Sequence, residues 1–225
     1  MIKNRILTAL LAVFVVIFVI TASIGLPIYV RPFYYMQIDS LGLEEETGYT
    51  KEEITQGYDE ILDFLTIPGR EYGTGVFASS SEGEGHFRDC KVLFDLNLTL
   101  LIISFVGVVA LIILNRLKIF SLSRPFGFSF LLTCGAGTLI FFALLGALCA
   151  LNFDKAFEIF HAIFFPGKDN WRFNPYRDEI ILAMPQEFFM SCAILIASSI
   201  ILISIGFIIY GIIEKKKREK QNEAL

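Results

Sequence analysis

The only two histidines of the chain, His86 and His161, are the side chains best suited to proton transfer near neutral pH. Asp89 lies three positions after His86, so on a helix its carboxylate would share a face with the imidazole and could hold it in one tautomer. Cys90 lies four positions after His86, a spacing at which an imidazole could activate a thiolate, although a cysteine that packs as a small hydrophobe is the commoner case. The segment therefore predicts acid–base or nucleophilic chemistry.

The stretch 160–189 gathers the second group of reactive and aromatic side chains between two long apolar segments. Loops held between rigid elements often carry binding and catalytic residues. The indole of Trp171, the guanidinium of Arg172 or the second histidine could donate a hydrogen bond to an oxyanion. Asp178 and Glu187 could orient an imidazole or receive a substrate ammonium. Like Asp89, each could instead fix its loop through an ion pair with one of the arginines at 88, 172 and 177.

A metal site and a redox pair are the alternatives that the same residues leave open. Two imidazoles with one of the carboxylates of Asp89, Asp178 or Glu187 would make a two-histidine, one-carboxylate site. Neither histidine belongs to an H-x-x-x-H or H-E-x-x-H pair, so we predict neither a metal nor a cofactor. There is no C-x-x-C motif, but Cys90 and Cys192 could form a disulfide. Two unrelated surface or core histidines are the simplest interpretation without chemistry.

The elements that must position these residues are membrane-spanning helices. Of the 225 residues 55% are hydrophobic, and the mean hydropathy of +0.63 is too high for a soluble domain. Four nearly uncharged segments reach the roughly 18 to 20 residues needed to cross a bilayer; they are residues 6–30, 96–114, 125–151 and 188–213. We predict an all-α polytopic membrane protein with four transmembrane helices. The first segment is longer than a usual signal peptide and lacks an A-x-A-like cleavage site, so we expect it to be retained.

The distribution of charge predicts the orientation. Ten Lys and Arg residues flank the spans on one side, at 3–5, 116–124 and 215–220, as the positive-inside rule expects of the cytoplasm. Both termini are then cytoplasmic. The loops 31–95 and 152–187 form a small extracytoplasmic cap that contains both histidines, and the first loop is acidic, with 14 Asp and Glu against 5 Lys and Arg. The basic tail is typical of a cytoplasmic stop signal rather than a nucleic-acid patch.

Local patterns predict three further features of these elements. A capping box of Thr50 and Glu53, followed by apolar residues at helical spacing, predicts an amphipathic helix over 51–65. The small and acidic residues 79–85 predict a mobile segment, either a lid beside His86 or a solvated linker. The glycines at 127, 135, 137 and 146 predict close helix approach around the third span.

Together these motifs resemble the lipoprotein intramolecular transacylase family of low-GC Gram-positive bacteria. The resemblance rests on H-F-x-D before the second span, on F-H-x-x-F-F with W-x-F-x-P-x-x-D, and on P-x-E-F-F entering the fourth. The predicted spans and loops divide the chain into residues 1–30, 31–95, 96–151, 152–187 and 188–225, and the resemblance implies that His86 and His161 are the catalytic histidines. The family's activity would move an acyl chain from the sn-2 glycerol oxygen to the α-amino group of the N-terminal cysteine of a diacylated bacterial lipoprotein.

Such a transfer would take place in the bacterial cell membrane, on its extracytoplasmic side, with lipoprotein and membrane lipid as partners and no nucleic acid. Exchanging an ester for an amide is downhill, so no ATP or cofactor is expected. Two other classes of function stay open. One is a non-catalytic four-span protein that binds lipid or a membrane partner, in which both histidines would tolerate substitution. The other is a metal-dependent membrane hydrolase that uses the same two histidines.

Overall fold

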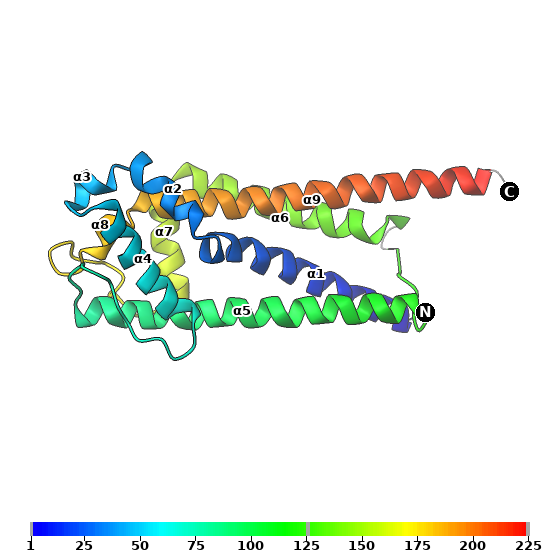
Figure 1. The fold of residues 1–225 in the computed structure, drawn as a ribbon. Helices are drawn as coiled ribbons and strands as arrows, with labels where there is room; N and C mark the ends of the chain where they lie inside the picture. The colour runs from blue at the N-terminus through cyan, green and yellow to red at the C-terminus, as the bar shows by residue number, and fades with distance from the viewer. Residues whose placement is uncertain (1, 125–126, 224–225) are drawn as a thin grey trace. The chain divides into compact units, whose positions relative to one another are not determined.

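The computed structural model describes residues 2–124 and 127–223, and within these ranges its regular structure is helical, without strands. The helices are α1 (Ile2–Tyr29), α2 (Pro32–Ser40), α3 (Leu43–Thr47), α4 (Lys51–Thr66), α5 (Ser81–Arg116), α6 (Phe130–Leu151), α7 (Phe153–Phe164), α8 (Ile180–Ala183) and α9 (Gln186–Glu223) (Figure 1). The predicted all-α class is therefore confirmed. The chain divides into two compact units.

Four of these helices are long and apolar enough to cross a membrane, namely α1, α5, α6 and α9. Each contains most or all of one predicted span. Helix α6 begins later than predicted, at Phe130, since residues 127–129 are not α-helical, and Pro125, the predicted start, lies outside the described residues. Helix α5 begins well before its apolar span, so HFRDC is helical and His86 and Asp89 stand three residues apart on it. Many apolar side chains of these helices are exposed, as expected for surfaces that face lipid.

The first unit consists of Met1–Ile24, Thr99–Leu148 and Ile196–Leu225. Glycines permit close packing at some of its helix contacts. A Cβ placed on Gly135 of α6 would lie 2.7 Å from the backbone oxygen of Ser204 in α9, which confirms the close approach predicted there. The same prediction is wrong for Gly127, Gly137 and Gly146, because a Cβ on any of them would meet nothing within 4 Å. Sequence pattern alone does not say which face of α6 meets a neighbour.

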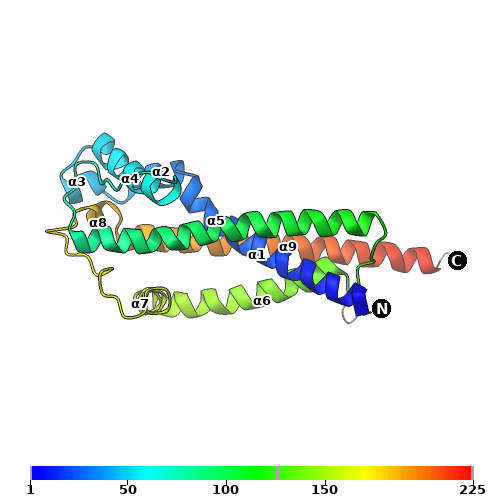
Figure 2. The same ribbon diagram turned by 90° about the horizontal axis from the view of Figure 1, so that it is seen from below.

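The second unit consists of Gly25–Leu98 and Cys149–Leu195, and it holds both histidines. Within it, α2, α3, α4 and α8 gather around an apolar core (Figures 1 and 2). Tyr34 of α2 stacks on Tyr58 of α4 with ring centroids 3.7 Å apart, and its hydroxyl donates a 2.7 Å hydrogen bond to the carbonyl oxygen of Ala183. The predicted capping box and amphipathic helix are confirmed in α4, whose Thr50 side chain accepts from the backbone N–H of Glu53.

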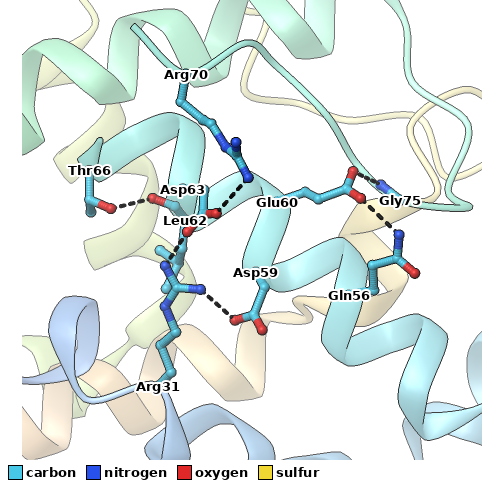
Figure 3. A network of polar contacts seen from close by, with 9 residues as sticks. All are labelled: Arg31, Gln56, Asp59, Glu60, Leu62, Asp63, Thr66, Arg70 and Gly75. Atoms are coloured by element: carbon cyan, nitrogen blue, oxygen red, sulfur yellow. Dashed lines mark hydrogen bonds and ion pairs between the residues drawn. The ribbon is translucent and has the colours of Figure 1, made fainter. Parts of the chain in front are cut away.

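Ion pairs fasten the chain after α1 to the outer face of α4 (Figure 3). The guanidinium of Arg31 donates to Asp59 at 2.9 Å and to Asp63, which also pairs with Arg70. Arginine suits this position because its planar fork can bind two carboxylates at once. The pairing neutralises part of the acidic surface of the first loop and fixes α4 beside the end of the first span.

The prediction that residues 79–85 are mobile is wrong, because α5 begins at Ser81 and takes in most of the segment. The buried carboxylate of Asp178 accepts hydrogen bonds from the backbone N–H of Ser80 at 2.8 Å and from its hydroxyl at 3.0 Å. A Cβ on Gly83 would lie 2.1 Å from the same carboxylate, so only glycine allows this approach. Small residues here serve close packing against Asp178 and do not form a linker.

Helix α7 carries the second histidine. It lies roughly perpendicular to the first turns of α5, and Figure 2 shows α7 almost end-on. It begins at a cap formed by Asn152, whose side chain accepts from the backbone N–H of Lys155. His161 lies on its buried side, whereas Ile159, Phe160 and Ile163 remain exposed. The helix thus presents one face to the protein interior and an apolar face outward.

Candidate active site

The two histidines meet inside the second unit. The exposed fraction is 6% for His86 of α5 and 5% for His161 of α7, and their ring centroids are 5.8 Å apart. Burying two imidazoles side by side costs free energy, because each ring carries two polar nitrogens that need hydrogen-bond partners, so packing alone does not favour such a pair. The arrangement is instead typical of a site in which both rings act on one substrate group.

His161 is held in a defined tautomer and ring orientation. Its Nδ1 lies 2.8 Å from the backbone carbonyl oxygen of Phe157, which can only accept, so Nδ1 carries the proton and Nε2 has a free lone pair. The indole of Trp171 stacks on the imidazole with centroids 4.3 Å apart. Burial lowers the pKa of His161, and the hydrogen bond to Phe157 offsets this only in part. A neutral imidazole with a free Nε2 is the form required of a general base.

His86 lies in an aromatic enclosure and keeps one nitrogen unpaired. The rings of Phe165 and Phe173 meet its imidazole edge to face, at centroid distances of 5.0 and 5.4 Å. Its Nε2 lies 3.4 Å from the Sγ of Cys90, one turn further along α5. Its Nδ1 is buried and has no hydrogen-bond partner among the described residues. Such an orphan nitrogen is uncommon in a folded protein, which makes His86 a candidate functional group.

The expectation that Asp89 holds the imidazole of His86 is wrong. Its carboxylate accepts instead from the ammonium of Lys168 at 2.5 Å and from the side-chain amide nitrogen of Asn170 at 3.2 Å. Asp89 therefore binds the loop after α7 to the beginning of α5. The ion-pair alternative was the better interpretation, but the partner is a lysine that sequence reasoning did not single out.

Asn170 is a further residue that the sequence did not reveal. Because the carboxylate of Asp89 only accepts, the amide nitrogen of Asn170 must face it, and this fixes the direction of the side chain. Its Oδ1 is buried and has no partner within the described part of the chain. An asparagine between a charged pair and a tryptophan carries no motif, so only the spatial closeness to Asp89 distinguishes it.

The other predicted site residues differ in how closely they are connected to the two histidines. Asp178 supports the N-terminal end of α5 and so positions His86 indirectly. Arg172 is exposed, and its guanidinium lies over the ring of Trp171 at 4.6 Å from the centroid. Glu187 is exposed in the first turn of α9, and within the described residues its carboxylate forms no hydrogen bond or ion pair with the site residues above. The structure thus brings Trp171 to the histidines directly, Arg172 through Trp171, and Glu187 not at all.

Potential metal ligands do not converge in the described residues, which contain no group of three or more His, Cys, Asp or Glu side chains that could hold an ion. The carboxylate of Asp89, one of the three that the sequence offered as a metal ligand, is already engaged by Lys168 and Asn170. Cys90 and Cys192 are free thiols, so the disulfide that the sequence left open is not formed. A surface hollow of about 600 Å³ is lined by charged and polar residues of α4 and by Tyr35 of α2, and neither histidine lines it.

Comparison with known proteins places this geometry in a family. The model of a family described as lipoprotein intramolecular transacylase Lit matches residues 9–189. The in meso structure of the membrane integral lipoprotein intramolecular transacylase Lit from Bacillus cereus is 28% identical, with a TM-score of 0.85, over 96% of this chain and 98% of that chain.

A variant of the same Bacillus cereus protein, in which a histidine is replaced by arginine, gives a TM-score of 0.78 at 28% identity over 97% of this chain and 95% of that one. None of the curated proteins matches the chain. With four apolar helices and membrane-integral relatives, the protein is a multi-pass membrane protein. Since the family model spans well over half of its length, the chain belongs to the lipoprotein intramolecular transacylase Lit family and is an acyltransferase.

Proposed function

We propose that the protein moves the sn-2 acyl chain of a diacylated lipoprotein to the α-amino group of the same N-terminal cysteine, which leaves the lyso form. The observation that carries the proposal is the meeting of His86 and His161, the only histidines of the chain, with complementary free nitrogens in a buried aromatic enclosure. Family membership supplies the reaction class, and the geometry of the two rings suits it.

His161 serves as the general base in this proposal. The α-amino group of the substrate has a pKa of about 7.7 to 8.0 in water, so the attacking form is the neutral amine, which has already lost one proton to solvent, and a base must take its second proton as the C–N bond forms. The free Nε2 of His161 accepts a proton from the amine as its nitrogen attacks the ester carbonyl carbon. The Phe157 carbonyl stabilises the resulting imidazolium because it accepts the proton on Nδ1.

His86 serves as the electrophilic partner. Attack on the ester produces a tetrahedral intermediate with a negative oxygen, which a positioned donor in a dry site stabilises strongly. The Nδ1 of His86 is buried and unpaired, and its N–H donates to this oxygen. Collapse of the intermediate breaks the bond to the glycerol oxygen, and the imidazolium of His161 returns its proton to that oxygen. The C–N bond formed and the C–O bond broken leave an amide and a free hydroxyl.

The remaining residues fold the substrate and exclude water. Amine and ester belong to one molecule, so the enzyme has to hold them in attack geometry, and neither ATP nor a cofactor takes part. The aromatic side chains around His161, among them Phe157, Phe160 and Trp171, form a seat for acyl chains. Asp89 with Lys168 keeps the loop that bears Trp171 against α5.

We place both histidines on the extracytoplasmic side, where diacylated lipoproteins are exposed after export. The support is the excess of Lys and Arg at the opposite ends of the spans, which puts both termini in the cytoplasm. A C-terminal epitope tag should therefore become detectable only after protoplasts are permeabilised, with a tagged cytosolic protein as the control. Detection of the tag on intact protoplasts would reverse this orientation.

The central test is the lipid form of lipoproteins in cells that make only diacylated lipoproteins and express this chain. Mass spectrometry of N-terminal lipopeptides should show the N-acylated lyso form with the wild type. We expect His161→Asn and His86→Asn each to reduce it at least about a hundredfold, the size of a lost acid–base contribution. Thermal unfolding of the purified variants shows whether they are folded.

Other outcomes would point to the other function classes. An unchanged yield of lyso product in both variants would overturn the proposal and favour a non-catalytic binding protein. Loss of wild-type activity with a chelator, restored by zinc, would favour a metal-dependent enzyme. In that case the expected product is a free fatty acid, because a metal-bound water would be the nucleophile.

A further inference from the structure

Cys90 contacts the histidine whose other nitrogen is unpaired, and the mechanism above gives this thiol no role. Its Sγ lies 3.4 Å from the Nε2 of His86, and it is packed at the edge of the apolar core of the second unit. We propose that Cys90 is a positioning residue that donates its thiol proton to Nε2 of His86 and thereby fixes the tautomer in which Nδ1–H faces the substrate ester. This inference rests on the proposed function.

The direction of the hydrogen bond follows from the chemistry of the two groups. An ordinary cysteine has a pKa near 8.5, and apolar surroundings raise it, so at neutral pH the group is a thiol with a proton to donate. The sulfur is a weak acceptor, whereas a neutral imidazole nitrogen is a good one. Donation from Sγ–H to Nε2 is therefore the favourable arrangement, and it leaves the single ring proton of His86 on Nδ1.

The second observation is the state of that Nδ1. The imidazole is more than nine-tenths buried, and Nδ1 finds no partner among the residues that the structure describes. A donor kept unpaired in the interior costs free energy unless a ligand completes it. The two histidines then present different nitrogens to the substrate. The carbonyl of Phe157 binds the Nδ1 proton of His161 and leaves its Nε2 as a base, while the thiol of Cys90 binds Nε2 of His86 and leaves its Nδ1–H as a donor.

Asp89 would have been the expected group to orient this ring, as carboxylates commonly do. It is occupied by Lys168 and Asn170, which leaves the thiol as the only side chain in hydrogen-bond contact with His86 in the described residues. A thiol also differs from a carboxylate in the form that it favours. A carboxylate would stabilise the imidazolium, whereas a neutral thiol donor stabilises the neutral ring that polarises a carbonyl.

The test uses the full-length protein, purified in detergent and labelled with ¹⁵N-histidine. Because the chain has only two histidines, the spectrum contains four ring nitrogens, and His161→Asn identifies those of His86. We expect Nδ1 of His86 to be protonated in the wild type and in Cys90→Ser, whose hydroxyl can donate in the same way. Cys90→Ala and Cys90→Val, which lack a donor, should lose this preference.

Kinetics on a synthetic diacylated lipopeptide give the second measurement. We expect Cys90→Ala and Cys90→Val to lower kcat about fivefold, the value of one net hydrogen bond, with KM unchanged. Cys90→Ser should recover at least half of the wild-type kcat. Cys149→Ala, at a half-buried cysteine that forms no hydrogen bond with either histidine in the described residues, is the matched control with unchanged kcat.

Three results would overturn the inference: protonation of Nε2 instead of Nδ1 in wild-type His86, an unchanged tautomer in both donor-free variants, or a Cys90→Ser enzyme as slow as Cys90→Ala. The valine variant covers the case in which the alanine variant does not fold. A wild-type protein that forms no lyso product would defeat the proposed function, while the nitrogen spectrum would still decide whether Cys90 sets the tautomer.

Discussion

At the scale of single residues, the two imidazoles differ more than their shared type suggests. His161 has its Nδ1 proton bound by a backbone carbonyl and a face covered by Trp171, whereas His86 touches a thiol and two phenylalanine edges. In the proposed mechanism one ring therefore presents a lone pair and the other a proton. The two identical side chains would obtain these different roles from the atoms that contact their second nitrogen.

The depressed pKa of His161 predicts a measurable titration. Burial favours the neutral ring, so the native protein binds this proton less readily than the unfolded chain, whose histidine titrates near 6.5. The unfolded state takes up more protons as the pH falls below about 6.5, and stability therefore decreases on acidification through that range. In ¹⁵N spectra of wild-type protein, we expect a midpoint for His161 below 6.5.

Replacing the stacked indole tests the cause of this shift. In Trp171→Ala the imidazole of His161 becomes more exposed, and its pKa should move back toward 6.5. The Arg172→Gln variant, which removes the guanidinium over the indole but leaves the indole in place, is the control. A wild-type midpoint at or above 6.5 would contradict the assignment of His161 as a base that stays neutral at working pH.

At the scale of elements, the site depends on how the loop after α7 is fastened to α5. Lys168 and Asn170 bind Asp89, and Asp178 binds Ser80. The segment 168–178 therefore contacts the N-terminal part of α5 at two places. His86 lies between these two attachments in the sequence. The geometry of the two histidines is thus set by contacts that neither ring makes itself.

Removing the ion pair between Lys168 and Asp89 should loosen the loop without unfolding the unit. Lys168 is half exposed, and a pair of this kind contributes up to about 1 kcal/mol. We expect Lys168→Ala to lower kcat/KM about twofold to fivefold. The difference between variant and wild type should shrink at high salt, because salt screens the ion pair that only the wild type has. Transfer rates at low and high ionic strength are the measurement.

Lys155→Ala is the matched control for this experiment. Lys155 is also a lysine in an exposed ion pair, but its partner Glu158 lies within the same helix. Its replacement should leave the rate unchanged. Equal effects of the two lysine substitutions would show that the loop attachment has no part in the reaction.

Local signals in the sequence were sufficient for the helices but not for their partners. The capping box at Thr50 and the uncharged spans act over a few residues, and both appear as predicted. The carboxylates choose partners far along the chain, since Asp89 binds residues 79 and 81 positions away and Asp178 binds one 98 positions away. The composition of residues 79–85 therefore predicted a mobile segment, whereas the distant carboxylate of Asp178 binds Ser80 at the point where α5 begins.

The meeting of the two histidines was predictable only in part. Their positions beside neighbouring spans suggested the same side of the membrane, and the resemblance to a family suggested a common site. The sequence around Cys90 does not say whether its thiol contacts His86 or only packs in the core, because the i to i+4 spacing is compatible with both. The rotamers that decide this depend on Phe165 and Phe173, which come from the other loop.

At the scale of the whole molecule, glycines set how closely the spanning helices of the first unit pack. We expect Gly135→Ala to destabilise the protein by about 1 to 3 kcal/mol, because the new methyl group would clash with the backbone of α9 at Ser204. Gly137→Ala, two residues along the same helix, meets open space and should be neutral. Thermal unfolding in detergent compares the two variants directly, and equal midpoints would contradict this packing.

The burial of both imidazoles also has a consequence for which product is made. In the proposed transfer, water would compete with the amine for the ester, and every water molecule that reached the carbonyl could release a free fatty acid in place of an amide. The rings of Trp171, Phe165 and Phe173 would then protect the yield of the transfer as well as its rate. The same two histidines in a cleft open to water would favour hydrolysis of the ester over acyl transfer.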